Sequence, residues 1–118
     1  MANYILSRMV SLYGVDIHPA AKIGSGIFMD HVVGIVIGET AVVEDDVTLF
    51  QNVTIGGTGK GSGDRHPKVC RGAFFGAGAQ VFGNIEIGAC AKIASGAVVV
   101  KAVAPGTTVV GPEVKPLG

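Results

Sequence analysis

Two histidines in this chain have the chemistry needed for proton transfer. His31 and His66 carry imidazole groups, which titrate near neutral pH, and each directly follows a charged residue, Asp30 or Arg65. A histidine placed beside a hydroxyl group can act as its base, because an alcohol at neutral pH is a poor nucleophile. A carboxylate on the other ring nitrogen would hold that base in one tautomer, and Asp16 precedes His31 by fifteen residues. We therefore take His31 as the candidate base and Asp16 as its partner.

A six-residue repeat of apolar residues must position these side chains. It consists of Ile17, Ile23, Met29, Ile37, Val43, Leu49, Ile55, Val69, Phe75, Val81, Ile87, Ile93 and Val99. Small or aliphatic residues follow four positions later, at Ala21, Ile27, Val33, Ala41, Val47, Val53, Ala73, Ala79, Ile85, Ala91 and Ala97. A period of six fits neither a helix nor a flat strand, and it predicts a β-solenoid in which three hexads close one triangular coil. The apolar residue should point inward and the small residue should fill the corner.

Two interruptions of the repeat coincide with the charged and histidine residues. The interval 29–37 is two residues too long and holds Asp30 and His31, and the interval 55–69 is eight too long and holds Arg65 and His66. A solenoid extrudes its surplus residues as loops, and such loops commonly carry function. One coil takes about eighteen residues, so stacking should bring Asp16 close to His31. The alternative is that Asp16 caps a turn and His31 is a solvated loop residue.

The composition indicates one domain and excludes several classes of partner. The 118 residues are 48% hydrophobic and 15% charged, and nine basic residues balance nine acidic ones. A net charge of zero gives no electrostatic footprint for nucleic acid or an anionic membrane. No apolar run approaches 18 residues, so we expect no membrane span. Outward aromatic residues on a thin prism favour self-association, and three faces suggest a homotrimer.

The first thirteen residues and the two cysteines support a cytoplasmic protein. Residues 1–13 are amphipathic, with Arg8 inside the apolar stretch, and we interpret them as a short N-terminal cap over the solenoid rather than a signal peptide. Residues 14–118 would then form the repeat domain. Cys70 and Cys90 are too few for a disulfide framework, so free thiols in a reducing compartment are expected.

Five stretches of the sequence carry a resemblance to a known family. They are residues 15–24 (VDIHPAAKIG), 29–31 (MDH), 34–42 (GIVIGETAV), 53–60 (VTIGGTGK) and 63–68 (GDRHPK). Together they resemble the catalytic domain of serine acetyltransferases, over roughly residues 14–111. The resemblance implies an all-β fold, a left-handed parallel β-helix of hexapeptide repeats with one extruded loop at 57–68. It also implies acetyl transfer from acetyl-CoA to the hydroxyl of serine, a step of cysteine biosynthesis.

The resemblance further implies a role for each candidate residue. His31 and Asp16 match the catalytic pair, and residues matching Asp30, Arg65 and His66 contact the amino-acid acceptor. An arginine suits this task because its guanidinium can hold a carboxylate through two parallel hydrogen bonds. We regard His18, inside an ordinary hexad, as structural.

The glycine-rich stretch 56–61 resembles a phosphate-binding loop but fails its pattern. The Walker motif requires a glycine where Thr54 lies and a Ser or Thr where Gly61 lies. The family resemblance instead implies that backbone groups of the coils hold acetyl-CoA. The matching residues are Gly57, Thr58, Ala77 and Ser95, and Lys92 is the candidate to meet a phosphate of the nucleotide end. The spacing of eighteen should place Ala77 and Ser95 in adjacent coils, although simple hexad packing explains these two residues equally well.

Two departures from the family affect the expected partners. Serine acetyltransferases carry a helical N-terminal domain before this region and a C-terminal tail that docks into cysteine synthase, and this sequence shows neither. We therefore expect a small-molecule acceptor and a homotrimer, and no cysteine synthase complex, nucleic acid or membrane.

Three other functions compete with serine acetylation. A sugar or capsular polysaccharide O-acetyltransferase would use the same chemistry on another hydroxyl, and short relatives of this fold do so without the helical domain. A carbonic anhydrase on this fold needs three histidine ligands with two closely spaced, which His18, His31 and His66 do not offer, so no metal is expected. A non-catalytic β-helix scaffold is the remaining alternative. The pairing of Asp30 with His31, and of Arg65 with His66, favours an amino-acid acceptor.

Overall fold

The computed structural model describes residues 15–30, 33–57 and 63–111, and in this part every regular element is a β-strand. The strands are two or three residues long because the other residues of each hexad form a turn. They are β1 (Asp16–Ile17), β2 (Lys22–Ile23), β3 (Phe28–Met29), β4 (Val36–Ile37), β5 (Val42–Val43), β6 (Thr48–Leu49), β7 (Thr54–Gly56), β8 (Lys68–Val69), β9 (Phe74–Phe75), β10 (Gln80–Phe82), β11 (Glu86–Ile87), β12 (Lys92–Ile93), β13 (Val98–Val99) and β14 (Thr108–Val109).

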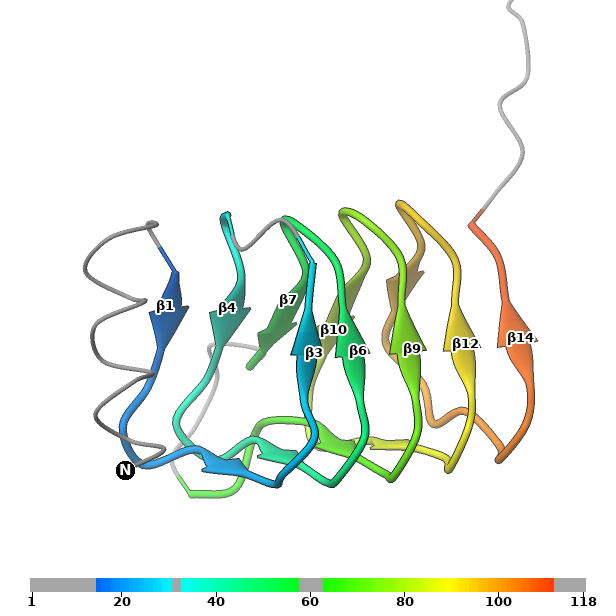
Figure 1. Cartoon of the computed structure of the whole chain (residues 1–118). Coiled ribbons are helices and arrows are strands. Elements are labelled where there is room, and N and C mark those ends of the chain that lie inside the picture. The colour runs from blue at the N-terminus through cyan, green and yellow to red at the C-terminus, as the bar shows by residue number, and fades with distance from the viewer. Residues whose placement is uncertain (1–14, 31–32, 58–62, 112–118) are drawn as a thin grey trace, which may run out of the picture.

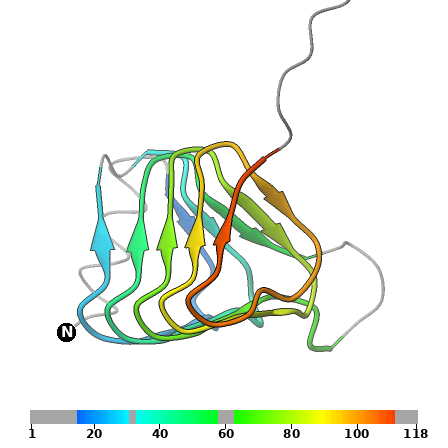
Figure 2. The same ribbon diagram turned by 90° about the vertical axis from the view of Figure 1, so that its right-hand side faces the viewer.

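Successive strands belong to three different parallel sheets, so each coil contributes one strand to each sheet, except that the last coil adds only the Ile87–Val103 bridge to the second sheet. The first sheet has the order β1-β4-β7-β10-β13, the second β11-β8-β5-β2, and the third β14-β12-β9-β6-β3. Figure 1 shows the coils side by side along the axis, and Figure 2 shows the three sheets around a roughly triangular section. The predicted fold, a left-handed parallel β-helix of hexapeptide repeats, is confirmed.

The core is a set of columns built by the inward residue of each strand. In the first sheet the register stacks Ile17 on Ile37, Ile37 on Ile55, and Val81 between Ile55 and Val99. All five side chains are buried. Burying aliphatic side chains contributes roughly 1.5–3 kcal/mol each, so these columns supply the main stabilisation. The hexad rule thus correctly identifies the inward positions.

One predicted corner residue is wrong. Val33 was expected at the corner after Met29, but its side chain is 55% exposed while that of Ile35 is fully buried. The two surplus residues of this interval shift the inward corner position from 33 to 35. The carbonyl of Val33 instead accepts a hydrogen bond from the Asn52 amide of the next coil at 2.8 Å.

The second interruption changes a corner in a similar way. We call the corner between the first and second sheets the first corner, and the one between the third and first sheets the third corner. At the first corner Pro67 takes the place of the small hexad residue, since its carbonyl accepts from Val42 at 3.1 Å. The amide of Lys68 then bonds the carbonyl of Ile85 at 2.9 Å. The chain therefore rejoins the coil at Pro67, directly after His66.

The turns require left-handed backbone, and among the described residues three other than glycine adopt it. Asp46, Asn52 and Cys90 all have φ of 60°. The Cys90 amide donates to the carbonyl of Arg71 in the preceding coil, which places Cys90 next to Gly72. Gly72 has a similar left-handed backbone, with φ of 74°. Cys70 and Cys90 form no disulfide.

Several predicted features fall outside this description. The N-terminal cap at 1–13, His31 and Thr58 are not among the described residues. Within the residues that the structure describes, no helix has the length and apolar character needed to cross a membrane.

Candidate active site

His66 lies buried at the first corner, where Thr40 of the preceding coil holds it. Its side chain is only 5% exposed. The Thr40 hydroxyl oxygen is 2.6 Å from His66 Nδ1, and the Thr40 amide donates to the same nitrogen at 3.2 Å. The contact forms because Thr40 lies between β4 and β5, and these strands pair with β7 and β8 on either side of His66. The stacking of coils therefore brings together residues that are far apart in sequence.

These bonds determine which ring nitrogen of His66 carries the proton. A backbone amide only donates, so its contact with Nδ1 favours an unprotonated acceptor at that atom, and the shorter contact with the hydroxyl strengthens this preference. The Thr40 hydroxyl accepts from the Arg65 amide at 3.1 Å, so its own hydrogen is available to Nδ1, with the nearby Asp64 carboxylate as the competing acceptor. The neutral ring then carries its proton on Nε2. Among the described residues, no hydrogen bond engages Nε2.

Two glycines make room for the His66 ring. A Cβ atom added to Gly38 would lie 2.1 Å from Nε2 and from Cδ2 of that ring, far inside contact distance. A Cβ atom added to Gly57 would lie 3.0 Å from Nε2. Gly38 follows β4 and Gly57 follows β7, so the ring packs against the ends of two neighbouring strands. The absence of side chains there lets the buried histidine sit directly on the backbone.

The surroundings of His66 favour its neutral form. Burial lowers the pKa of the imidazole below its ordinary value of 6.5, and the positive charges of Arg65 and Lys68 lower it further. The acidic groups of Glu39 and Asp64 act in the opposite direction but are weaker influences. At neutral pH His66 is therefore an uncharged hydrogen-bond donor.

Lys68 holds the end of the loop against the same corner. Its ammonium donates to the carbonyl oxygens of Thr40 and His66, each at 2.9 Å, and also to the carboxylate of Asp64. That bond lowers the pKa of the exposed Asp64 carboxyl. The backbone on both sides of His66 is thus bonded to the preceding coil.

The other predicted residues gather near the third corner. Asp30 follows β3, is half-buried, and donates its amide to the Leu49 carbonyl at 3.0 Å. Ala77 and Ser95 lie in adjacent coils as their spacing predicts, because the Gly96 amide bonds the Ala77 carbonyl at 2.9 Å. Gly76 permits this close stacking, since a Cβ atom there would be 2.6 Å from the Ser95 amide nitrogen.

Asp16 and Lys92 lie on strands close to this corner. Asp16 is exposed on β1 and pairs with Val36 of β4, the strand that follows the corner carrying Asp30. Lys92 is exposed on β12 of the third sheet, between Phe74 and Thr108. Because His31 lies outside the described residues, its pairing with Asp16 stays a prediction.

The structure therefore divides the predicted site residues between two corners of the prism. Gly57, Arg65 and His66 lie at the first corner, whereas Asp30, Ala77 and Ser95 lie at the third. The whole first sheet separates the two groups, so one chain does not bring them together. Sequence reasoning did not identify Thr40, Gly38 or Lys68. Their only signal was that all three fall inside stretches that carry the family resemblance.

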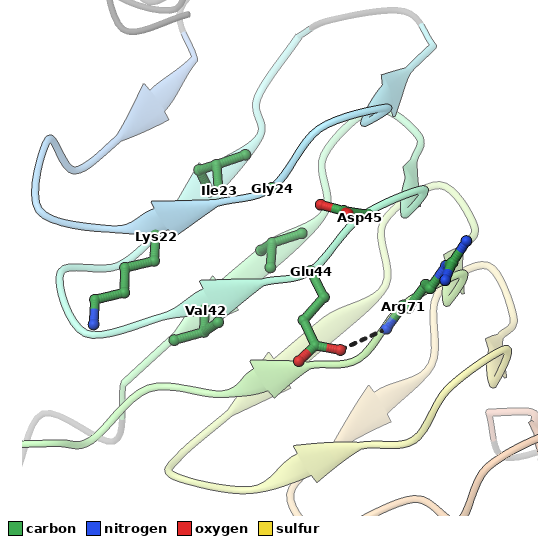
Figure 3. A pocket seen from close by; sticks show the side chains of 8 residues that line it. Lys22, Ile23, Gly24, Val42, Glu44, Asp45 and Arg71 are labelled. Atoms are coloured by element: carbon green, nitrogen blue, oxygen red, sulfur yellow. Dashed lines mark hydrogen bonds between the residues drawn. The ribbon is translucent and has the colours of Figure 1, made fainter.

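A groove also lies on the second sheet, away from these corners. It has a volume of about 420 Å³ and is lined by residues of β2, β5 and the turns after them, together with Arg71 (Figure 3). Both acidic residues of its lining already have partners: Glu44 accepts the Arg71 amide at 3.0 Å, and Asp45 accepts the Ser25 amide at 2.9 Å. None of the predicted site residues lines it, so it is not the candidate active site.

A metal centre finds no support in the geometry of residues 15–30, 33–57 and 63–111. Within those ranges no three His, Cys, Asp or Glu residues are grouped so that they could hold an ion.

Comparisons with known proteins agree on one family. No family model matches the chain. The serine acetyltransferase of Salmonella typhimurium is 54% identical over all 118 residues, which span 43% of that relative. The crystal structure of a Brucella abortus serine acetyltransferase in complex with coenzyme A is 56% identical, with a TM-score of 0.86, over 95% of this chain and 45% of that one. A soybean serine acetyltransferase complexed with serine is 54% identical, with a TM-score of 0.85, over 90% of this chain and 44% of that one.

The resemblance expected from the sequence is thereby confirmed at the level of sequence and fold. The chain spans less than half the length of these relatives, so the match concerns their β-helix region. This chain is a homologue, along its whole length, of the part of serine acetyltransferases that it spans.

Proposed function

We propose that the chain is the catalytic core of an acetyl-CoA-dependent serine O-acetyltransferase. The observation that carries the proposal is the likeness, at 54–56% identity, to solved serine acetyltransferases that hold coenzyme A and serine. The buried His66 beside Arg65 adds physical support, since a neutral donor and a guanidinium together suit the carboxylate of an amino acid. A neutral sugar acceptor offers no carboxylate for this pair.

In the proposed reaction His31 removes the proton from the serine hydroxyl. The freed oxygen attacks the thioester carbonyl of acetyl-CoA, and the tetrahedral intermediate collapses by breaking the carbon–sulfur bond. The coenzyme A thiolate leaves and takes up the proton held by His31. Asp16 keeps the imidazole in one tautomer, and backbone amides near Gly57 stabilise the oxyanion, an interaction often worth about 3 kcal/mol.

The acceptor side of the site is formed by Asp30, Arg65 and His66. Arg65 binds the serine carboxylate, and the Nε2 proton of His66 donates to the same group. Asp30 supplies negative charge for the ammonium of serine. Acetyl-CoA lies along the coils, in contact with Gly57, Thr58, Ala77, Lys92 and Ser95.

These residues occupy two corners, which supports a homotrimer in which neighbouring copies share each site. The first corner of one copy would face the third corner of the next, so that acetyl-CoA lies between them. Phe28, Val98 and Val100 are large apolar side chains that are exposed in one chain, and an interface would cover such residues. Sedimentation should give three times the mass of the chain. The free thiols further support a cytoplasmic location.

The proposal is tested by measuring coenzyme A release from acetyl-CoA with serine and with a panel of sugars. Serine should support turnover, and sugars should not. His31→Ala should lower turnover at least about a hundredfold, whereas His18→Ala should not. Turnover with a sugar but not serine would assign the other acceptor class, and the absence of acetyl-CoA binding would leave a scaffold.

A further inference from the structure

The geometry points to Thr40 as a positioning residue that sets the tautomer of His66, so that His66 offers an Nε2 proton to an anionic oxygen of the acceptor. This inference deepens the proposed function and rests on it for the identity of the acceptor. Thr40 itself touches no reacting atom and would act only through His66.

Thr40 directs every polar group it has toward the returning loop. Its amide and hydroxyl bond His66 Nδ1, its hydroxyl accepts from the Arg65 amide, and its carbonyl accepts from Lys68. A residue that merely fills a corner needs none of these bonds, and Ala20 occupies the corresponding place one coil earlier. The same contacts fix both residues proposed to bind the acceptor carboxylate, since the Arg65 backbone and the His66 ring meet at one hydroxyl.

The fixed tautomer determines what the His66 ring presents to the acceptor. With Nδ1 occupied by two donors, the single proton of the neutral ring is on Nε2. That atom lies against Gly38 and Gly57 and makes no hydrogen bond to any described residue. The other tautomer would present a lone pair at Nε2 and repel a carboxylate. Thr40 therefore determines whether His66 attracts or repels the acceptor.

The charged groups around His66 make this control necessary. Arg65 and Lys68 are the cations beside the ring, and Glu39 and Asp64 are the acids. The cations and burial keep the ring neutral, and a neutral imidazole has a free choice of tautomer. Hydrogen bonds from a neighbouring residue are what remove that choice.

Thr40→Val tests the inference because valine keeps the shape and the backbone bonds but lacks the hydroxyl. We expect the KM for serine to rise about five- to tenfold, the effect of losing roughly one hydrogen bond, with kcat and the KM for acetyl-CoA changed less than about twofold. Thr40→Ser keeps the hydroxyl and should restore the parent KM. Thr48→Val is the matched control, because Thr48 is a half-buried threonine on β6 of the same coil, away from the loop.

A direct measurement of the tautomer needs no turnover. Long-range proton–nitrogen NMR spectra of the chain with ¹⁵N-labelled histidine should show His66 at pH 7.5 as the neutral Nε2–H form. In Thr40→Val only the longer contact from the backbone amide to Nδ1, at 3.2 Å, would remain, so the His66 signals should move toward a mixture of tautomers. In Thr48→Val they should not.

Several results would overturn the inference. An Nδ1–H tautomer in the parent chain contradicts it, whatever the activity. A Thr40→Ser variant as impaired as Thr40→Val would assign the effect to the methyl group, and an equal rise in both KM values would indicate general damage to the fold. If the parent chain shows the Nε2–H form but transfers no acetyl group to serine, the proposed function fails while the control of the tautomer by Thr40 stands.

Discussion

The hydroxyl of Thr40 lies 2.6 Å from Nδ1 of His66, although the two residues are 26 positions apart in the sequence. The contact exists because the chain leaves the coil after β7, returns at Pro67, and so places His66 one coil above Thr40. It connects the repeat, which supplies Thr40, to the insertion, which supplies His66 and Arg65. A regular scaffold thus fixes the donor atoms of an inserted loop.

Replacing Gly38 by alanine should displace the His66 ring. The new Cβ atom would lie 2.1 Å from two ring atoms, so either the ring or the strand end must move. Overpacking of this kind typically costs about 1–3 kcal/mol, and the free energy of unfolding from urea titration should fall by that amount. The KM for serine should rise as well.

Gly111→Ala is the control for this substitution. Its added Cβ atom would meet its nearest neighbour at 3.5 Å, an ordinary contact distance. Equal stability of Gly38→Ala and Gly111→Ala would mean that the His66 ring does not occupy the space over Gly38.

The stability of the protein should depend on pH through His66. Burial, Arg65 and Lys68 lower the pKa of this group in the folded chain below its ordinary value of 6.5. The unfolded chain therefore binds the proton more readily, and the contribution of His66 is fully present above pH 6.5 and is lost as the pH falls toward the lowered pKa. The free energy of unfolding should decrease between pH 7.5 and pH 5.5.

His66→Gln should make this part of the pH dependence disappear, while His18→Gln should leave it in place, since His18 is exposed. The measurement is urea unfolding of the three proteins at a series of pH values. A steeper loss of stability in His66→Gln than in the parent chain would refute the assignment.

The sequence predicted the scaffold well because the scaffold follows from one local rule. Columns such as Ile37 on Ile55 need only an apolar residue every six positions. The rule failed at Val33, where two surplus residues shift the inward position to Ile35. It was also silent on Thr40 and Lys68, because their partners depend on where the inserted chain rejoins the coil. The family resemblance located Arg65 and His66, but the division of the site between two corners emerges only in three dimensions.

Neither cysteine should be needed for acetyl transfer. Burial raises the pKa of the Cys70 thiol, and the nearby carboxylates of Glu86 and Glu44 raise it further, so little nucleophilic thiolate exists at neutral pH. The double variant Cys70→Ala with Cys90→Ala should retain turnover within about twofold of the parent. Mass spectrometry of the enzyme quenched during turnover should detect no acetylated cysteine, and a stable acetyl-cysteine formed at the rate of turnover would contradict direct transfer.

The site proposed for serine acetylation is shared by the third corner of one copy and the first corner of the next. It is tested most directly by denaturing His31→Ala and His66→Ala together, refolding them as mixed trimers, and measuring serine-dependent release of coenzyme A. At a serine concentration well below the parent KM, each variant alone should be strongly impaired. In an equal mixture about a quarter of the sites combine an intact first corner with an intact third corner, so activity should return to about a quarter of the parent value. Mixed trimers that stay inactive would contradict the shared site.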